Sequence, residues 1–394
     1  MKKLIAIAVV FALVAGVAFA EINVSGEVFG KITPLFGDSS EGNDGKVHAT
    51  GEMRRIRLEA SGQDDNGVFG GYIRIDHAPW WTGSWNGDLA VVGSETGILT
   101  GNVWWKPIEQ FKLTLGGNGS DGFFGADGVT RWGFYQVAAD GVGVAEENWV
   151  WSSSFFGGFD PLYSALLTVT PIEGLEINVG IPFWNGGAEA KDIYNFINAQ
   201  VAYNISGIGK LALTYAGNTN EGLDDGSKMW AYFGLSAIEN LGLDIGLGFQ
   251  FPGSDSDADA TNNPPIAIGL GASYGAGGFG IKARFQAVLG GSSKVGSTET
   301  KGDTDIAVDI LPSYAISDNA TVFLSVGMAI NSPDSGDSTT SWHINPYVAL
   351  KSNWWAPNFY AGLRISSDGA KGSSGDGDAS RVDWSVPIGI AIHF

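Results

Sequence analysis

The chain contains no cysteine, few charged residues and, beyond its first twenty positions, no apolar run long enough for a transmembrane helix. The absence of cysteine excludes disulfide frameworks, thiolate catalysis and zinc sites built on cysteine. Only 16% of the 394 residues are charged, against about 25% in an average protein. Lysine and arginine number 22 against 42 aspartates and glutamates, so the net charge is −20. A nucleic-acid partner is not expected, since phosphate binding needs a basic surface.

The first twenty residues have the composition of a secretory signal peptide. Two lysines precede an apolar run over 4–17, and Ala18 and Ala20 stand at the −3 and −1 positions of a cleavage site. A membrane anchor is the weaker reading, because the run is short and ends in that site. We expect cleavage to remove 1–20 with its two lysines, leaving 21–394 as a single domain whose net charge falls from −20 to −22.

After the leader, apolar and polar residues alternate. Ile56 and Leu58, for example, alternate with Arg55 and Arg57, and similar segments recur along the chain. Because successive side chains of a strand point to opposite faces, each such segment has one apolar and one polar face. The pattern predicts an all-β protein.

Short turns join many of these segments. One turn motif occurs at 106–116, 170–180 and 236–246, with a looser copy at 314–327. Proline fixes the backbone in the first two copies, and alternation resumes at once, which indicates tight hairpins. Four further tight turns are expected at 61–67, 205–209, 275–278 and 352–357.

Longer polar stretches lie between the hairpins. These nine stretches are 37–50, 78–98, 118–161, 185–192, 219–226, 253–263, 291–303, 332–338 and 367–380. Eight tight turns and nine loops imply 18 strands, within a range of 16 to 20. Short turns at one end and long loops at the other are typical of a closed antiparallel transmembrane β-barrel with periplasmic turns and extracellular loops. A soluble sandwich or propeller is the alternative, but it does not explain this asymmetry.

The acidic excess is concentrated in the nine long stretches. They carry 26 of the 42 carboxylates and six of the 22 basic residues. The net charge of the chain therefore says little about the barrel wall.

Tryptophan and proline add detail to the predicted barrel. Eight tryptophans near predicted strand ends suggest a girdle at the membrane–water interface: Trp104, Trp105, Trp184, Trp230, Trp342, Trp354, Trp355 and Trp384. Four prolines within or near strands each remove a ladder hydrogen bond and are expected at strand ends or bulges: Pro182, Pro312, Pro346 and Pro387.

The last strand carries a recognisable pattern. Ile388, Ile390 and Ile392 share one face with the final Phe394. This alternation resembles the C-terminal assembly signal of Gram-negative outer-membrane proteins. The resemblance implies outer-membrane insertion by the barrel-assembly machinery, and contact with outer-membrane lipid.

The order of the loops resembles that of trimeric general porins and sugar-selective porins, in which the loop after the fifth strand folds into the lumen. The longest loop here, 118–161, follows the fifth predicted strand, and Arg55, Arg57 and Arg74 have inward parity on strands two and three. The resemblance implies a constriction between these arginines and the loop carboxylates. The candidate carboxylates are Asp121, Asp127, Asp140, Glu146 and Glu147.

Two features of this resemblance stay open. The loop could instead be a solvated surface loop, with the wall arginines paired to Glu59 and Asp76. Its aromatic residues could stack on sugars, hold the loop to the wall or form a trimer contact, and holding the loop is the favoured reading; they include Trp132, Trp149 and Trp151. The resemblance also makes a homotrimer plausible, and the porin subclass is not identified.

No constellation for covalent chemistry is found. The four histidines lack metal-binding spacing, and His343 near Ser341 does not make a hydrolase site. Asp255, Asp257 and Asp259 resemble the start of a calcium loop, but the completing Gly and Glu are missing. We therefore expect no enzyme, no cofactor and no metal, with these aspartates a weak calcium candidate.

The sequence thus predicts an outer-membrane porin for passive diffusion of small hydrophilic solutes such as ions and sugars. The main alternative is a surface adhesin or receptor that uses the barrel to anchor its loops. A channel for hydrophobic solutes ranks lower, because it needs an apolar lumen or an N-terminal plug.

Overall fold

The structure is a computed structural model. It describes residues 21–37, 47–77, 97–116, 164–182, 197–217, 227–251, 261–263, 265–295, 298–333, 336–352, 357–367 and 382–393. The expected signal peptide and Phe394 lie outside these ranges. Over the ranges given, no helix has the length and apolar character needed to cross a membrane.

Strands make up most of the described chain. The strands before residue 251 are β1 (Glu21–Gly37), β2 (Val47–Gln63), β3 (Phe69–His77), β4 (Gly97–Ile108), β5 (Phe111–Gly116), β6 (Ser164–Ile172), β7 (Leu175–Pro182), β8 (Asn198–Ile205), β9 (Gly209–Ala216), β10 (Lys228–Ile238) and β11 (Leu241–Gln250). The later strands of the same sheet are β13 (Ile266–Ala276), β14 (Phe279–Leu289), β17 (Thr304–Ser317), β18 (Ala320–Ser332), β19 (Thr339–Ser352), β20 (Pro357–Gly362), β21 (Arg364–Ser367) and β22 (Val382–His393). A second, three-stranded sheet contains β12 (Thr261–Asn263), β15 (Ser292–Val295) and β16 (Thr298–Lys301).

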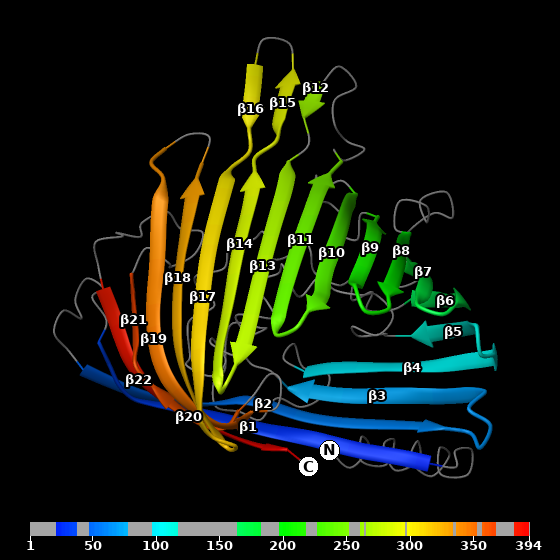
Figure 1. Ribbon diagram of the computed structural model, residues 1–394, viewed down its shortest axis with the longest axis horizontal. Helices are drawn as coiled ribbons and strands as arrows, with labels where there is room; N and C mark the ends of the chain where they lie inside the picture. Colours follow the sequence, from blue (N-terminus) through cyan, green and yellow to red (C-terminus); the bar gives the residue numbers. More distant parts are fainter. Residues whose placement is uncertain are drawn as a thin grey trace.

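Backbone pairing joins the large sheet into a closed ring. Successive strands pair antiparallel, and β1 pairs with both β2 and β22. The short strands β20 and β21 both pair with β19 and with β22, so they are two parts of one strand. The 19 strands of this sheet therefore occupy 18 positions in the described chain. In Figure 1, blue β1 lies beside red β22, where the ring closes. The predicted closed antiparallel barrel is confirmed.

The barrel turns its apolar face outward. On β11, Ile245 and Leu247 are 53% and 50% exposed, whereas Gly246 and Gly248 between and beyond them are buried. Large exposed aliphatic side chains recur at alternate positions on most strands of the ring. A soluble protein rarely exposes so much contiguous apolar surface. The arrangement is that of a barrel whose outer band contacts lipid.

The described tight hairpins fall where the sequence places them; residues 353–356 of the expected turn at 352–357 lie outside the described ranges. The repeated motif forms two-residue turns at 109–110, 173–174 and 239–240. In all three hairpins the register shifts by a bulge two to three residues before the turn. The turn residues Gly174 and Asn240 have φ of 80° and 63°, a left-handed conformation that these two residue types tolerate best.

Neighbouring hairpins are tied together at the turn end of the barrel. The bulged residues Lys106 and Thr170 donate their backbone N–H groups to the carbonyls of Val68 and Gln110, at 2.7 and 2.9 Å. Ser236 makes the equivalent bond to the preceding hairpin, at Ile208. The bulges thus satisfy donors that would otherwise face the membrane interface unpaired.

The four prolines lie at or beside places where strand pairing ends or is interrupted. Pro182 ends β7, as expected. Pro312 lies where the β17–β18 ladder is interrupted, since neither Leu311 nor Pro312 pairs with β18. The carbonyl of Pro346 accepts a hydrogen bond from the Leu363 N–H at 2.9 Å. Because proline has no N–H, Pro346 cannot donate the second ladder bond to Leu363, the residue that separates β20 from β21.

Pro387 lies next to the same interruption. Neither Pro387 nor Val386 pairs with β20 or β21, and the β1–β22 register shifts between Ile32 and Leu35, opposite these residues. The prolines near the closing strand therefore form one irregular seam.

Two predicted loops contain strands. The stretches 253–263 and 291–303 hold β12, β15 and β16, which pair with one another as a small sheet. Figure 1 shows this sheet extending beyond the loop end of β13, β14 and β17. Its sequences are Thr-, Ser-, Lys- and Asn-rich, so they lack the apolar alternation on which the strand prediction depended. Backbone pairing, not burial of an apolar face, defines these strands.

Glycines lie opposite bulky inward side chains. Gly389 pairs with Tyr360, and a Cβ at Gly389 would overlap the Tyr360 ring. Gly70 pairs with Trp104 in the same way. The high glycine content therefore has a packing role here, because it makes room for large side chains on the inner face.

The apolar outer band leads to the first prediction. Replacing Ile245 with Arg, near the middle of β11, should destabilise the inserted barrel by about 2–4 kcal/mol, because the charge must enter hydrocarbon. Reversible denaturant unfolding from lipid vesicles measures this difference.

Ile238→Arg provides the matched control, because Ile238 is 51% exposed but lies beside the turn. Its cost should be about 0–1 kcal/mol, as at an interface. Equal costs at the two positions would contradict a lipid-facing band.

Candidate functional site

The described inner wall varies in exposure. From β7 to β22 many of its side chains are buried; Asn178, Trp230 and Asn345, for example, are 0% exposed, whereas Lys282 on β14 is exposed. On β2, the side chains of Arg57 and Glu59 retain 17% and 29% of their accessible surface. In the described part of the chain, solvent therefore reaches the inner face of β2, and it also reaches Lys282 on β14.

The structure corrects part of the predicted tryptophan girdle. Trp105 and Trp384 are exposed on the outer face, as expected. Trp230 is buried on the inner face, and Trp104 also points inward, where it lines a pocket. The prediction was wrong for these two residues because proximity to a strand end does not reveal which face a side chain takes.

A charged cluster lies on the inner face of β2 and β3. Arg57 Nε is 3.8 Å from Glu59 Oε1. The hydroxyl of Tyr72 donates to the same oxygen at 3.0 Å. Arg74 lies directly opposite Glu59 in the β2–β3 ladder, and Arg57 lies opposite Asp76. Arg57 thus has the carboxylate of Glu59 as a neighbour on the wall.

Most of the predicted constriction lies outside the described residues. This holds for Asp121, Asp127, Asp140, Glu146 and Glu147, for Trp132, Trp149 and Trp151, and for the side chain of Arg55. Of the predicted set, Arg57 and Arg74 are brought together on the inner wall. A constriction between them and the loop stays a prediction.

The described side chains of the inner wall are basic on balance. Directly opposed residues in the ladders share a face, which assigns eight basic and five acidic described side chains to the inner face. They are Arg57, Arg74, Lys112, Lys210, Lys228, Lys282, Arg284 and Arg364, with Glu59, Glu176, Asp244, Asp305 and Asp309. The net charge of these described side chains is opposite in sign to that of the whole chain.

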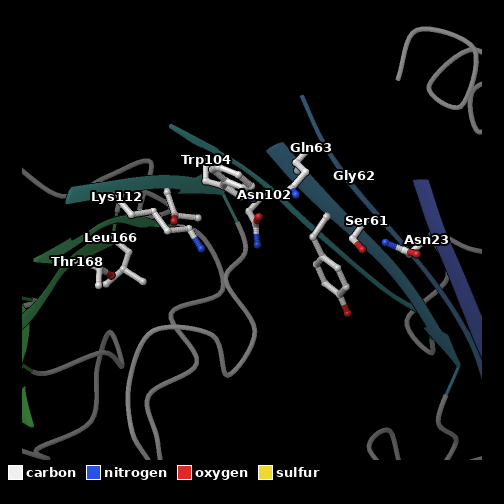
Figure 2. Close-up of a pocket in the computed structure, with 12 residues that line it drawn as sticks. Asn23, Ser61, Gly62, Gln63, Asn102, Trp104, Lys112, Leu166 and Thr168 are labelled. Atoms are coloured by element: carbon white, nitrogen blue, oxygen red, sulfur yellow. The ribbon is translucent and has the colours of Figure 1, made fainter. Parts of the chain in front are cut away.

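A pocket of about 430 Å³ opens beside the charged cluster. Its lining comes from the six consecutive strands β1 to β6. Figure 2 shows the Trp104 indole and the Lys112 amine on one side and Asn23, Ser61 and Gln63 on the other. Its remaining polar lining consists of Tyr72, Asn102, Thr114 and Thr168. The alternation of the sequence could have placed these residues on the inner face, because alternate residues of a strand share a face. Only the register between strands shows that they lie side by side.

A second polar group crosses β17, β18 and β19 on the buried part of the wall. Ser325 Oγ and His343 Nε2 are 3.1 Å apart. Asp309 and His343 lie on either side of Gly327 in the ladders, and a Cβ at Gly327 would overlap both the Asp309 carboxylate and the His343 ring. The sequence analysis considered Ser341 as the neighbour of His343, whereas the structure places Ser325 beside it.

The burial of this group defines its role. Ser325, His343 and Asp309 are each at most 2% exposed, so a substrate carbonyl cannot reach the serine hydroxyl in this structure. We describe the three residues as a polar cross-strand network that packs the wall.

The structure gives little information on the remaining predicted site residues. The calcium candidates Asp255, Asp257 and Asp259 lie outside the described residues. Across the residues that the structure describes, no three His, Asp or Glu side chains are grouped to hold a metal ion. In β22, Ile390 and Ile392 are exposed outward and Ile388 shares their face, but the role of this strand in assembly stays a prediction.

Known structures share the fold of this chain. The outer membrane protein OpdK from Pseudomonas aeruginosa matches with a TM-score of 0.56 and 12% identity, over 96% of this chain and 100% of that one. OccK9 (OpdG) from the same organism matches with a TM-score of 0.53 and 13% identity, over 94% and 98% of the two chains. No protein-family model and no curated sequence matches the chain. The chain therefore has an outer-membrane-type β-barrel fold.

The network around Gly327 leads to a stability prediction. Gly327→Ala places a methyl group against the Asp309 carboxylate and the His343 ring, and should destabilise the barrel by about 1–3 kcal/mol through overpacking. The loss is measurable as a lower temperature for conversion of the compact, SDS-resistant barrel to the unfolded form.

Gly275→Ala is the control, since a Cβ there meets only the Phe279 carbonyl oxygen, at an ordinary 3.8 Å. An unchanged transition temperature in Gly327→Ala would show that the network has room to rearrange.

Proposed function

We propose that this protein is an outer-membrane porin that forms a water-filled channel for passive diffusion of small hydrophilic solutes. The observation that carries the proposal is the inversion of polarity across the wall. The closed ring has an apolar outer face and, along β1–β6, a polar inner face that solvent reaches. Such a wall stabilises water and ions inside a membrane that excludes them from its hydrocarbon.

A structure of the same fold supports a role in binding small solutes. OpdK has been solved with vanillate, and that structure matches this chain with a TM-score of 0.54 and 12% identity. The match supports the architecture, while the identity of the solute must come from the wall of this chain.

The proposed mechanism requires no covalent chemistry. Solutes would pass along the β1–β6 side, where Arg57, Glu59 and Arg74 present charges of both signs to the lumen. The basic balance of the described wall favours anions there, whereas the acidic long stretches favour cations at the mouth. We propose that the wall, and not the net charge of the chain, sets the preference of the narrow part, with the carboxylates of 118–161 opposing it if that loop enters the lumen.

The assembly of the channel is part of the same proposal. Lipid would cover the exposed aliphatic band, and β22 with Phe394 would serve as the signal for the barrel-assembly machinery. The porin resemblance favours a homotrimer.

One observation favours a different function. Many described side chains on the inner face from β7 to β22 are buried, and a barrel filled with side chains would serve as an anchor for exposed loops. A surface adhesin or receptor is therefore the second candidate. The two functions differ in conductance, because an anchor carries no ionic current.

Conductance in planar bilayers is the test. The purified protein should form stable ionic channels, and Arg57→Gln should shift the reversal potential in a salt gradient toward cation preference, because a positive charge leaves the inner wall. Lys301→Gln, in the small sheet outside the ring, removes the same charge and should shift the potential much less.

Two outcomes would count against the porin. The absence of channels from correctly folded protein would favour the anchor. Equal shifts in the two variants would show that the wall cluster does not lie on the ion path.

A further inference from the structure

We propose that the pocket between β1 and β6 is a binding site for a neutral sugar ring. The proposal rests on the proposed channel function and adds a class of solute to it. The pocket lies on the inner face, its volume of about 430 Å³ falls within the range of ligand sites, and its lining combines one indole with amide and hydroxyl groups. That combination matches a sugar, which has apolar C–H faces and a rim of hydroxyls.

The indole of Trp104 supplies the apolar platform. Its six-membered ring lies over Gly70, where a Cβ would overlap it. Gly70 is directly opposite Trp104 in the β3–β4 ladder, so the backbone supports the ring from beneath. A ring held against the wall is pre-organised for stacking and loses little conformational entropy on binding. Leu166, only 3% exposed, adds apolar surface to the same lining.

The polar groups lie in rows across the strands. Asn23, Ser61, Tyr72 and Asn102 are successive opposed partners on β1 to β4. Thr114 lies opposite Trp104 in the next ladder. Carboxamides and hydroxyls both donate and accept, which suits the mixed demands of sugar hydroxyls better than a purely charged lining.

Two lining hydroxyls are oriented by bonds within the wall. Tyr72 donates its proton to Glu59 at 3.0 Å, and Thr168 donates its proton to Asn178 at 2.7 Å. Both oxygens keep lone pairs that can accept a further hydrogen bond. A sugar hydroxyl can donate to such an oxygen without competing for the proton already committed to the wall.

Most of the lining is uncharged, which suits a neutral ligand. The lining has one basic residue, Lys112, and no acidic residue; the Lys112 Nζ lies 5.3 Å from the centroid of the Trp104 ring. A cation–π contact of this kind is weak at an accessible site, so a stacking sugar can displace the amine. The displaced ammonium then donates to sugar hydroxyls at the edge of the platform.

Saturation-transfer NMR on the full protein in detergent micelles tests the proposal independently of conductance. With glucose as the probe, saturation of the protein should reach the ring C–H protons of the sugar. Trp104→Leu keeps apolar bulk but removes the aromatic platform, and it should raise the dissociation constant for glucose roughly threefold to tenfold. Trp105→Leu is the matched control, since Trp105 is the adjacent residue on the outer face and its loss should leave binding unchanged.

Three further results decide the assignment. Glucose binding that is equal in Trp104→Leu and the parent protein, with both shown to be folded by heat-modifiability, would overturn the site. Stronger binding of gluconate than glucose, abolished in Lys112→Met, would overturn its neutral character in favour of an acid. Glucose binding that depends on Trp104 in a protein that forms no channels would retain the sugar site while rejecting the porin.

Discussion

The need to pair every backbone N–H and C=O group within the hydrocarbon of a membrane governs this structure. No water is available there to satisfy a free strand edge, so the sheet has to close, and the pairing of β1 with β22 closes it. The other features follow from this requirement. Antiparallel neighbours need short connections at one end, bulges at that end direct spare N–H groups to the next hairpin, and irregular backbone concentrates where prolines remove donors.

Closure also couples the inner face to the packing of the wall. Each inward side chain shares its level with residues directly opposite on both neighbouring strands, so a large group needs a small partner. Gly70 beneath Trp104, Gly327 between Asp309 and His343, and Gly389 beside Tyr360 are instances of this rule. The same glycines that permit the ring to pack therefore determine where aromatic platforms and polar networks can stand in the lumen.

The sequence predicts the closed antiparallel barrel and its hairpins well, because a period of two and the turn residues are local signals. It fails for the small sheet of β12, β15 and β16, whose polar strands have no buried face to create such a signal. It also misses contacts that depend on register. The partner of His343 is Ser325 on the adjacent strand, not the nearby Ser341, and the pocket gathers residues from the six consecutive strands β1 to β6.

The irregular seam at the closing strand has a consequence for how the barrel comes apart. The β20–β21 interruption and the register shift near Pro387 leave β22 with broken runs of ladder bonds on both sides. Under mechanical or chemical stress the ring should open along this line first, and amide protons beside it should exchange soonest. Since the seam joins the first and last strands, opening it unrolls the wall as one continuous sheet instead of breaking it into fragments. The line along which the barrel opens first therefore lies at β22, beside the first strand of the ring.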